Sequence, residues 1–249
     1  MTCISHSHRY AYVHIYKAGG TAVSELLLAH ARLRERVARH PVGRKIFYAV
    51  NIAQEKASRG RLPKGTSSWY MGLEKHAPLS EVVAYLGPSR RDYRLFSVIR
   101  EPLSWVESQY NYISMRPLHA QHKAVSAMSL ADYAEDFIAR GRGLQSHMLR
   151  PAPLPGGGSR AIDAVFTLES LAADTGPLRS FLGLPEAEDA ALPRRNQSSA
   201  RGTRGALPAS LRAELTQYLA PDIVLHDAAV AAGGALLATP SRPVPVAGI

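Results

Sequence analysis

Cysteine is almost absent from this 249-residue sequence, and its scarcity excludes two kinds of scaffold. The single cysteine, Cys3, cannot form an intrachain disulfide, and without a Cys cluster there is no thiolate zinc site. Long apolar runs are missing too: no segment approaches the roughly 18 residues of a membrane span, and the first residues contain no signal-peptide core. We therefore expect a cytoplasmic protein that does not span a membrane.

Acidic residues are also scarce, because 30 Lys and Arg face only 20 Asp and Glu, for a formal net charge of +10. This excess favours anionic partners such as nucleotides, nucleic acid or acidic membranes. The basic stretch from Arg32 to Arg44 supports a basic nucleic-acid-binding module as one alternative. The sequence lacks aromatic-basic interleaving, a helix-turn-helix signature and zinc-finger ligands, however. We therefore rank nucleic acid below a nucleotide and expect no nucleic-acid partner.

What the sequence does contain is a repeated strand-turn-helix pattern. With 46% hydrophobic residues, the chain is long enough to bury one core. β-Branched, aromatic and other apolar residues predict strands at residues 10–16, 95–99 and 164–168, each followed by helical periodicity. Strands that alternate with helices indicate a parallel sheet covered on both faces, which binds ligands at the carboxyl ends of its strands. We therefore predict an α/β fold with a central parallel sheet flanked by helices.

The other segments are predicted from spacing, caps and breakers. The helix after the first strand is expected to run from Val23 to Val37, and Pro102 is expected in the first turn of the helix after the second. Further helices are predicted at residues 79–86, 129–141, 210–219 and 223–237, and loops at 41–75 and 151–158. We expect one domain over residues 1–238 and a disordered, Pro-rich tail over residues 239–249.

The first candidate site follows the first predicted strand, where Lys17, Gly19, Gly20 and Thr21 precede a helix. Glycines let backbone N–H groups approach an anion, the helix dipole favours negative charge, and lysine neutralises it. The simpler interpretation is an ordinary strand-to-helix turn with a solvated lysine. The lysine precedes the glycines, and no Walker or dinucleotide-binding motif occurs in the chain. A nucleotide kinase-like phosphotransferase is therefore only an alternative.

The second candidate site follows the second predicted strand, at Arg100-Glu101-Pro102. An arginine between a strand and a helix can make forked, charge-assisted hydrogen bonds to a phosphate. Ser108 lies further along the same predicted helix, where an exposed surface serine is an equally good interpretation of the residue.

Together these segments resemble the PAPS-dependent sulfotransferases, in particular the carbohydrate sulfotransferases; PAPS is 3′-phosphoadenosine 5′-phosphosulfate. Residues 14–22 read H-I-Y-K-A-G-G-T-A and are similar to the family's H-I-P-K-T-A-G-T-S, although Ala18 and Ala22 lack two hydroxyls. Arg100 and Ser108 are similar to its R-[DEN]-P and S-x-Y motif. Weaker similarities occur at residues 74–77, 166–171 and 192–198, so the resemblance covers about residues 10–227.

The resemblance implies a P-loop-like three-layer fold, PAPS as donor, no metal, and a hydroxyl acceptor such as a carbohydrate or another small molecule. The donor-binding residues it implies are Lys17, Gly19, Gly20, Thr21, Ala22, Arg100 and Ser108. Variable loops choose the acceptor in such enzymes, so the sequence does not identify it.

Two residues are assigned catalytic roles. Lys17 is expected to stabilise the leaving phosphate as negative charge develops on it. The ordinary pKa of imidazole lies nearest to neutral pH, so a histidine is the expected general base. Among the ten histidines, most of which are expected to be surface or packing residues, His76 is the candidate because residues 74–77 resemble the family's K-H-A-T segment; Glu74 is the alternative, and His14 is expected in a structural role. One or more residues of a basic cluster are candidates for a further cation over the 3′-phosphate, without a choice among Arg194, Arg195, Arg201 and Arg204. A solvated basic loop is the simpler interpretation for most of the four.

Overall fold

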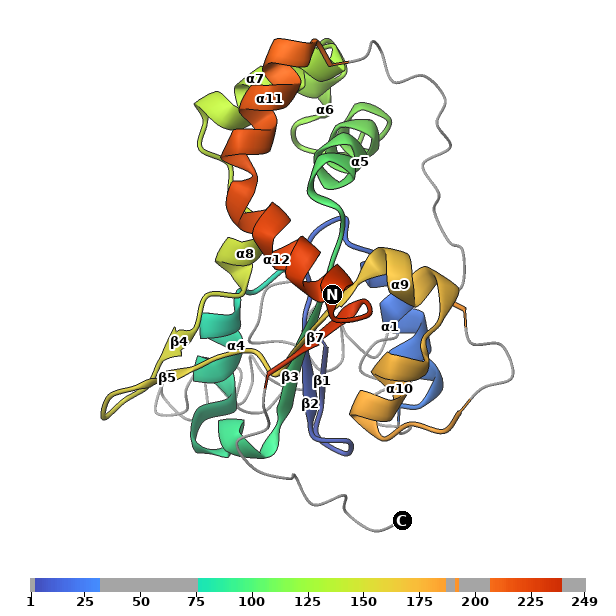
Figure 1. The fold of residues 1–249 in the computed structure, drawn as a ribbon, viewed down its shortest axis with the longest axis vertical. Coiled ribbons are helices and arrows are strands. Elements are labelled where there is room, and N and C mark those ends of the chain that lie inside the picture. Colours follow the sequence, from blue (N-terminus) through green and yellow to red (C-terminus); the bar gives the residue numbers. More distant parts are fainter. Residues whose placement is uncertain (1–2, 32–75, 187–190, 193–206, 239–249) are drawn as a thin grey trace, which may run out of the picture.

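The computed structural model describes residues 3–31, 76–186, 191–192 and 207–238 (Figure 1). In these residues the centre of the fold is a five-stranded mixed sheet with the strand order β1-β2-β3-β6-β7. The strands are β1 (Cys3–Ser5), β2 (Tyr10–Val13), β3 (Arg94–Ile99), β6 (Ala164–Thr167) and β7 (Ala235–Leu237). β2, β3 and β6 run parallel, whereas β1 pairs antiparallel with β2 and β7 pairs antiparallel with β6. The protein therefore has an α/β fold with a parallel centre.

The three strands predicted from sequence are confirmed as the parallel centre, and the sheet also has two antiparallel edge strands that the sequence did not predict. β1 is only three residues long, which is too short to show the alternation of apolar and polar residues that predicts a strand. At the other edge, helix α12 (Ala220–Ala231) ends six residues before the predicted end at Leu237. Gly233 and Gly234, with φ values of 79° and 89°, turn the chain back into β7.

Alternate side chains of the central strands enter two separate hydrophobic clusters, so the sheet is buried on both faces. On one face Tyr12, Phe96 and Phe166 pack with α1 (Gly20–Ala29), α9 (Leu168–Ala173) and α10 (Gly176–Leu182). On the other, Val13 and Leu95 pack with α4 (Leu79–Leu86) and with the helices beyond the sheet. The predicted arrangement of helices on both faces is confirmed, and burial on both faces explains the continuous apolar runs of the strands.

A second group of helices lies beyond the carboxyl ends of the parallel strands (Figure 1). It contains α5 (Pro102–Ser114), α6 (His122–Val125), α7 (Leu130–Ala139), α8 (Gln145–Met148), α11 (Ala209–Tyr218) and α12. The predicted helix at residues 129–141 is confirmed as α7, and it begins with a capping box in which Ser129 and Asp132 bond to each other's backbone N–H groups. The 3-10 helix η1 (Gly87–Asp92) and the short hairpin of β4 (Ala152–Pro153) and β5 (Ser159–Arg160) complete the described elements.

Helix α1 is shorter than its apolar spacing predicts, because it ends at Ala29 rather than near Val37. The C-cap residue is His30, whose carbonyl oxygen accepts a hydrogen bond from Nε2 of His8 at 3.0 Å. The His30 carbonyl therefore binds the side chain of His8, whereas in a longer helix it would accept a hydrogen bond from a backbone N–H of the next turn. The predicted loop at 41–75 and the predicted tail at 239–249 lie outside the described residues.

Candidate anion-binding site at the carboxyl edge of the sheet

Both candidate motifs leave the sheet at the same edge. In the parallel pairs, Val13 lies opposite Ser97 and Ile99 lies opposite Thr167, so β2, β3 and β6 end side by side. The indole N–H of Trp105 donates a 2.6 Å hydrogen bond to the carbonyl oxygen of Tyr16. This bond ties α5, which follows β3, to the loop that follows β2. The structure therefore brings the Lys17 loop and the Arg100 turn to one edge.

The two glycines of the first motif are required by close packing. Gly19 has a left-handed φ of +74°, and a Cβ there would lie 2.3 Å from Cδ1 of Leu168. At Gly20 a Cβ would lie 1.7 Å from Nε2 of His14, far inside van der Waals contact. His14 is only 6% exposed and fills the space under the first turn of α1. Glycine is therefore the residue that lets the loop fold over the His14 ring.

The variant Gly20→Ala is expected to lower the free energy of unfolding by about 1–3 kcal/mol, because the buried His14 ring must move. Urea denaturation measures the loss. Gly143→Ala is the matched control, because nothing lies within 4 Å of its Cβ position, and it is expected to change stability by less than about 0.5 kcal/mol. Equal stability of the two variants would contradict the packing argument.

Lys17 adopts a left-handed backbone conformation, with a φ of 63°. Among the described non-glycine residues only Arg9 shares a positive φ. Such a conformation costs about 1–3 kcal/mol and persists where the surrounding structure demands it, often at functional sites. The ammonium group lies 4.1 Å from the ring centroid of Tyr112, in a cation–π contact that joins the loop to α5.

The start of α1 has no side-chain cap and no acidic residue in its first turn. The N–H groups of Gly20, Thr21 and Ala22 precede the first intrahelical bond, which runs from Val23 to the carbonyl of Gly19. These three groups, with the positive end of the helix dipole, form an arrangement that suits an anion. Thr21 is exposed at this position, which leaves its hydroxyl accessible.

The two alanines that depart from the family motif lie on buried surfaces. Ala18 is fully buried and Ala22 is 8% exposed, and they belong to the hydrophobic clusters on opposite faces of the sheet. A hydroxyl at either position would be surrounded by apolar atoms, which disfavours it. Ala22 can therefore contact an anion only through its backbone N–H.

Arg100 is half-buried, and among the described residues its guanidinium group makes no hydrogen bond or ion pair. Its backbone is held firmly instead, because the amide of Gln145 bonds to both its N–H and its carbonyl. Ser108 is only 3% exposed, so the alternative of an exposed surface serine is wrong. It lies on the buried side of α5, nearly two turns past the start of that helix.

Glu101 is the N-cap of α5, a role that the sequence argument missed, although an acid directly before a helix-starting proline is a recognisable cap. Its carboxylate accepts hydrogen bonds from the N–H groups of Leu103 and Ser104 at 3.1 and 2.7 Å. Burial opposes its ionisation, but these bonds and the proximity of His226 outweigh burial and hold the pKa of Glu101 below its usual range. Because a carboxylate already occupies the start of α5, that end attracts an anion less than the start of α1 does.

His76 lies against the first loop. Its Nδ1 is 3.0 Å from the carbonyl oxygen of His14, and its ring centroid is 4.5 Å from that of His14. Because a carbonyl can only accept, Nδ1 donates, and Nε2 is the proton-accepting nitrogen of the neutral ring. The ring also makes an edge contact with Tyr16, whose phenol pKa is raised by burial and by Tyr112 and Tyr133. The structure thus brings His76 to the Lys17 loop.

Glu74, Arg194, Arg195, Arg201 and Arg204 lie outside the described residues. Within the described part of the chain, no three His, Cys, Asp or Glu side chains are arranged to hold a metal ion. A search of those same residues finds no helix long and apolar enough to cross a membrane.

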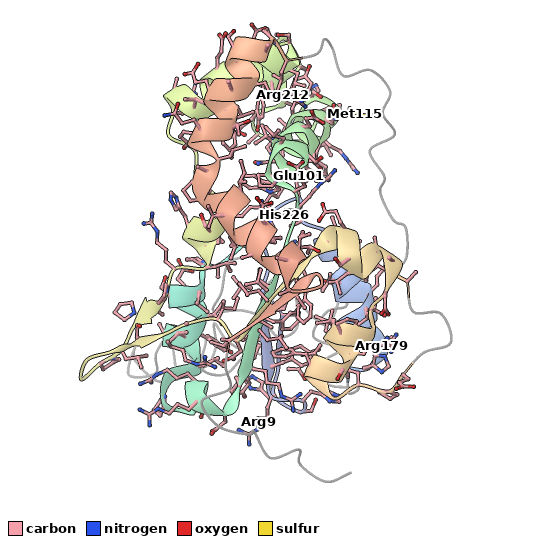
Figure 2. The ribbon with its side chains drawn as sticks, viewed as in Figure 1. Arg9, Glu101, Met115, Arg179, Arg212 and His226 are labelled. Atoms are coloured by element: carbon pink, nitrogen blue, oxygen red, sulfur yellow. The ribbon has the colours of Figure 1, made fainter. Side chains whose placement is uncertain are left out.

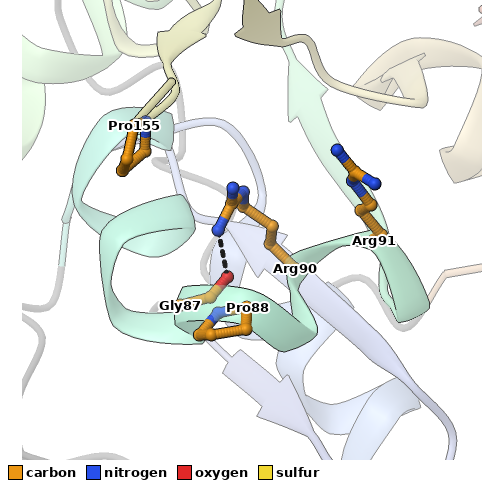
Figure 3. A pocket seen from close by; sticks show the side chains of 5 residues that line it. All are labelled: Gly87, Pro88, Arg90, Arg91 and Pro155. Carbon is orange, nitrogen blue, oxygen red and sulfur yellow. Dashed lines mark hydrogen bonds between the residues drawn. The ribbon is translucent and has the colours of Figure 1, made fainter. Parts of the chain in front are cut away.

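A pocket of about 500 Å³ lies at the opposite edge of the sheet, before the start of β3 (Figure 3). It is lined by Gly87, Pro88, Arg90, Arg91 and Pro155. Arg90 donates a 2.6 Å hydrogen bond from Nη1 to the carbonyl of Gly87. This pocket is separate from the Lys17 loop and the Arg100 turn.

Comparisons with protein-family models, with curated proteins and with solved structures found no match for this chain.

Proposed function

We propose that this protein is a sulfotransferase that moves the sulfuryl group of PAPS to a hydroxyl of a carbohydrate or another small acceptor, at a P-loop-like site. One observation carries the proposal: Lys17, the uncapped start of α1 and Arg100 follow two adjacent parallel strands at one edge of the sheet. Two separate cationic positions on one edge suit a donor that has phosphates at its 5′ and 3′ positions. The order and spacing of the motifs resemble those of the sulfotransferase family, which supports the proposal.

In the proposed mechanism the acceptor oxygen attacks sulfur in line with the bond to the 5′-phosphate. The new S–O bond forms as the old one breaks, and the electron pair of the broken bond stays on the phosphate oxygen. Lys17 stabilises that developing charge, and the N–H groups of Gly20, Thr21 and Ala22 hold the 5′-phosphate. Nε2 of His76 takes the proton of the acceptor hydroxyl. Arg100 binds the 3′-phosphate.

A thermal-shift comparison tests the donor site. Adenosine 3′,5′-bisphosphate is expected to stabilise the fold more than AMP or ATP, because a ligand that binds only the native state raises stability by mass action, about 2.7 kcal/mol at 100 times Kd. A stabilisation equal to that by AMP would contradict a 3′-phosphate site. A larger effect of ATP would favour a phosphotransferase, and a larger, steeply salt-dependent effect of duplex DNA would favour a nucleic-acid-binding module.

The variant Arg100→Lys is expected to weaken binding of adenosine 3′,5′-bisphosphate by about 1–3 kcal/mol, because lysine keeps the charge and loses the planar fork. Isothermal calorimetry measures the change. Arg212→Lys, on the exposed side of α11, makes the same replacement away from the sheet edge and is the control. An unchanged affinity in Arg100→Lys would remove Arg100 from the site.

A further inference from the structure

We propose that helix α12 holds the Arg100-Glu101 turn in its ligand-binding shape through two relays of polar side chains, so that Asp222 and His226 are positioning residues for Arg100. The inference rests on the proposed role of Arg100 in binding the 3′-phosphate. Asp222 and His226 are four residues apart and therefore face the same side of α12, one turn from each other. Both are buried, with exposed fractions of 1% and 9%.

The first relay runs from Asp222 through Gln145 to Arg100. The two carboxylate oxygens of Asp222 accept hydrogen bonds from the N–H groups of Gln145 and Ser146, both at 2.8 Å. Gln145 is 1% exposed, and its side chain turns toward Arg100. Its Oε1 accepts from the Arg100 N–H at 2.9 Å, and its Nε2 donates to the Arg100 carbonyl at 2.8 Å. Both backbone groups of Arg100 are thereby held by one amide.

The second relay runs from His226 through Glu169 to Glu101. Nε2 of His226 lies 3.5 Å from Oε2 of Glu169, which is an ion-pair contact without hydrogen-bond geometry. The other oxygen of Glu169 accepts a hydrogen bond from the Glu101 N–H at 3.0 Å. Figure 2 shows Glu101 and His226 next to each other between the sheet and the upper helices, and the proximity of His226 contributes to the lowered pKa of Glu101. The exposed carboxylate of Asp227 lies 3.8 Å from Nδ1 of His226 on the outer side.

The relays supply hydrogen-bond partners to the backbone N–H groups of Arg100 and Glu101. Arg100 and Glu101 follow the last residue of β3 and precede the first residue of α5, so neither the sheet nor the helix supplies partners for their N–H groups. Side chains from two distant segments supply both partners. Apolar side chains in place of Gln145 and Glu169 would also bury this edge of the sheet. They would not fix the orientation of the backbone at Arg100 and Glu101, because apolar contacts are not directional. Because the Arg100 side chain extends from this turn, the direction in which its guanidinium group points depends on the relays.

The variant Gln145→Met tests the first relay, because it keeps the size of the side chain and removes both bonds to Arg100. The readout is calorimetric affinity for adenosine 3′,5′-bisphosphate divided by that for AMP, which isolates the 3′-phosphate. We expect this ratio to fall about tenfold while the AMP affinity stays unchanged, as for a displaced binding group. Gln109→Met is the matched control: it replaces another buried glutamine, whose Nε2 has no hydrogen-bond partner among the described residues, and is expected to keep the ratio.

The outcomes distinguish the proposed 3′-phosphate role of Arg100 from the proposed relay through Gln145. A wild-type ratio near one would overturn the 3′-phosphate role of Arg100 and the relays with it. A clear wild-type preference that Gln145→Met retains would overturn the relay alone.

A second pair of variants applies if Gln145→Met shows no cooperative thermal transition. His226→Leu is expected to lower the ratio, whereas His226→Gln, whose amide can donate to Glu169, is expected to restore most of it. Equal ratios in His226→Leu and the wild type would overturn the role of α12. A merely structural role would lower the affinities for both nucleotides together.

Discussion

Replacing His76 with alanine is expected to lower turnover with an alcohol acceptor by about 10²–10⁴-fold and to leave the affinity for adenosine 3′,5′-bisphosphate nearly intact. The Nδ1 bond to the His14 carbonyl fixes the tautomer whose Nε2 accepts a proton. A group that only removes a proton contributes to the rate and not to donor binding. Steady-state kinetics with a titration of adenosine 3′,5′-bisphosphate separate the two quantities.

The nature of the acceptor sharpens this prediction. With a nitrophenol, whose hydroxyl is already acidic, the defect of His76→Ala is expected to shrink, because an ionised nucleophile needs no base. His8→Ala is the matched control: His8 also lies against a backbone carbonyl, that of His30 at 3.0 Å, but at the opposite edge of the sheet. Near-normal turnover of His76→Ala with an alcohol would exclude His76 as the base and make Glu74 the next residue to replace.

Replacing Lys17 with alanine is expected to lower the chemical rate by about 10²–10³-fold, the scale for loss of one preorganised charge-stabilising group. Donor affinity is expected to fall as well, because the ammonium group also attracts the 5′-phosphate in the ground state. Single-turnover measurements report the chemical step directly. This joint loss of rate and affinity distinguishes Lys17 from His76.

The left-handed backbone of Lys17 allows the effect of the ammonium group on the rate to be distinguished from the effect of backbone strain on stability. Lys17→Gly removes the same ammonium group and also relieves the left-handed conformation, so it is expected to be about 1–2 kcal/mol more stable than Lys17→Ala with an equal loss of rate. Lys123→Ala removes an exposed lysine of α6 and is expected to leave the rate unchanged. A rate for Lys17→Ala close to that of the wild type would exclude leaving-group stabilisation by Lys17.

Charge at the proposed site is arranged unevenly. The start of α1 has no acidic group, whereas the start of α5 is occupied by Glu101, whose lowered pKa keeps it ionised at neutral pH. Arg100 therefore lies beside a carboxylate that is already committed to two backbone N–H groups. A 3′-phosphate at this position would be bound by the arginine side chain and not by the helix start.

Several features of the fold could be predicted because short-range patterns determine them. Strands buried on both faces consist of consecutive apolar residues, so β2, β3 and β6 could be predicted from the sequence. Ser129 and Asp132 signal the start of α7 because both bonds of a capping box form within one turn. The lysine and glycines before α1 could be recognised as a motif, but the packing of Gly19 against Leu168 and of Gly20 against His14 could not be predicted.

What the sequence alone determined is therefore the α/β class, the three parallel strands and the positions of the two motifs that follow them. Only the tertiary structure decided the antiparallel edges, the early end of α1 and the partners of Arg100. The bond from Gln145 to Arg100 spans 45 residues, and the bond from Asp222 to Gln145 spans 77. No local pattern encodes such pairs, because they exist only after α12 has packed against α5, α8 and β6. Backbone propensities act over a few residues, whereas the direction of a side chain at a strand end depends on what the folded chain packs against it.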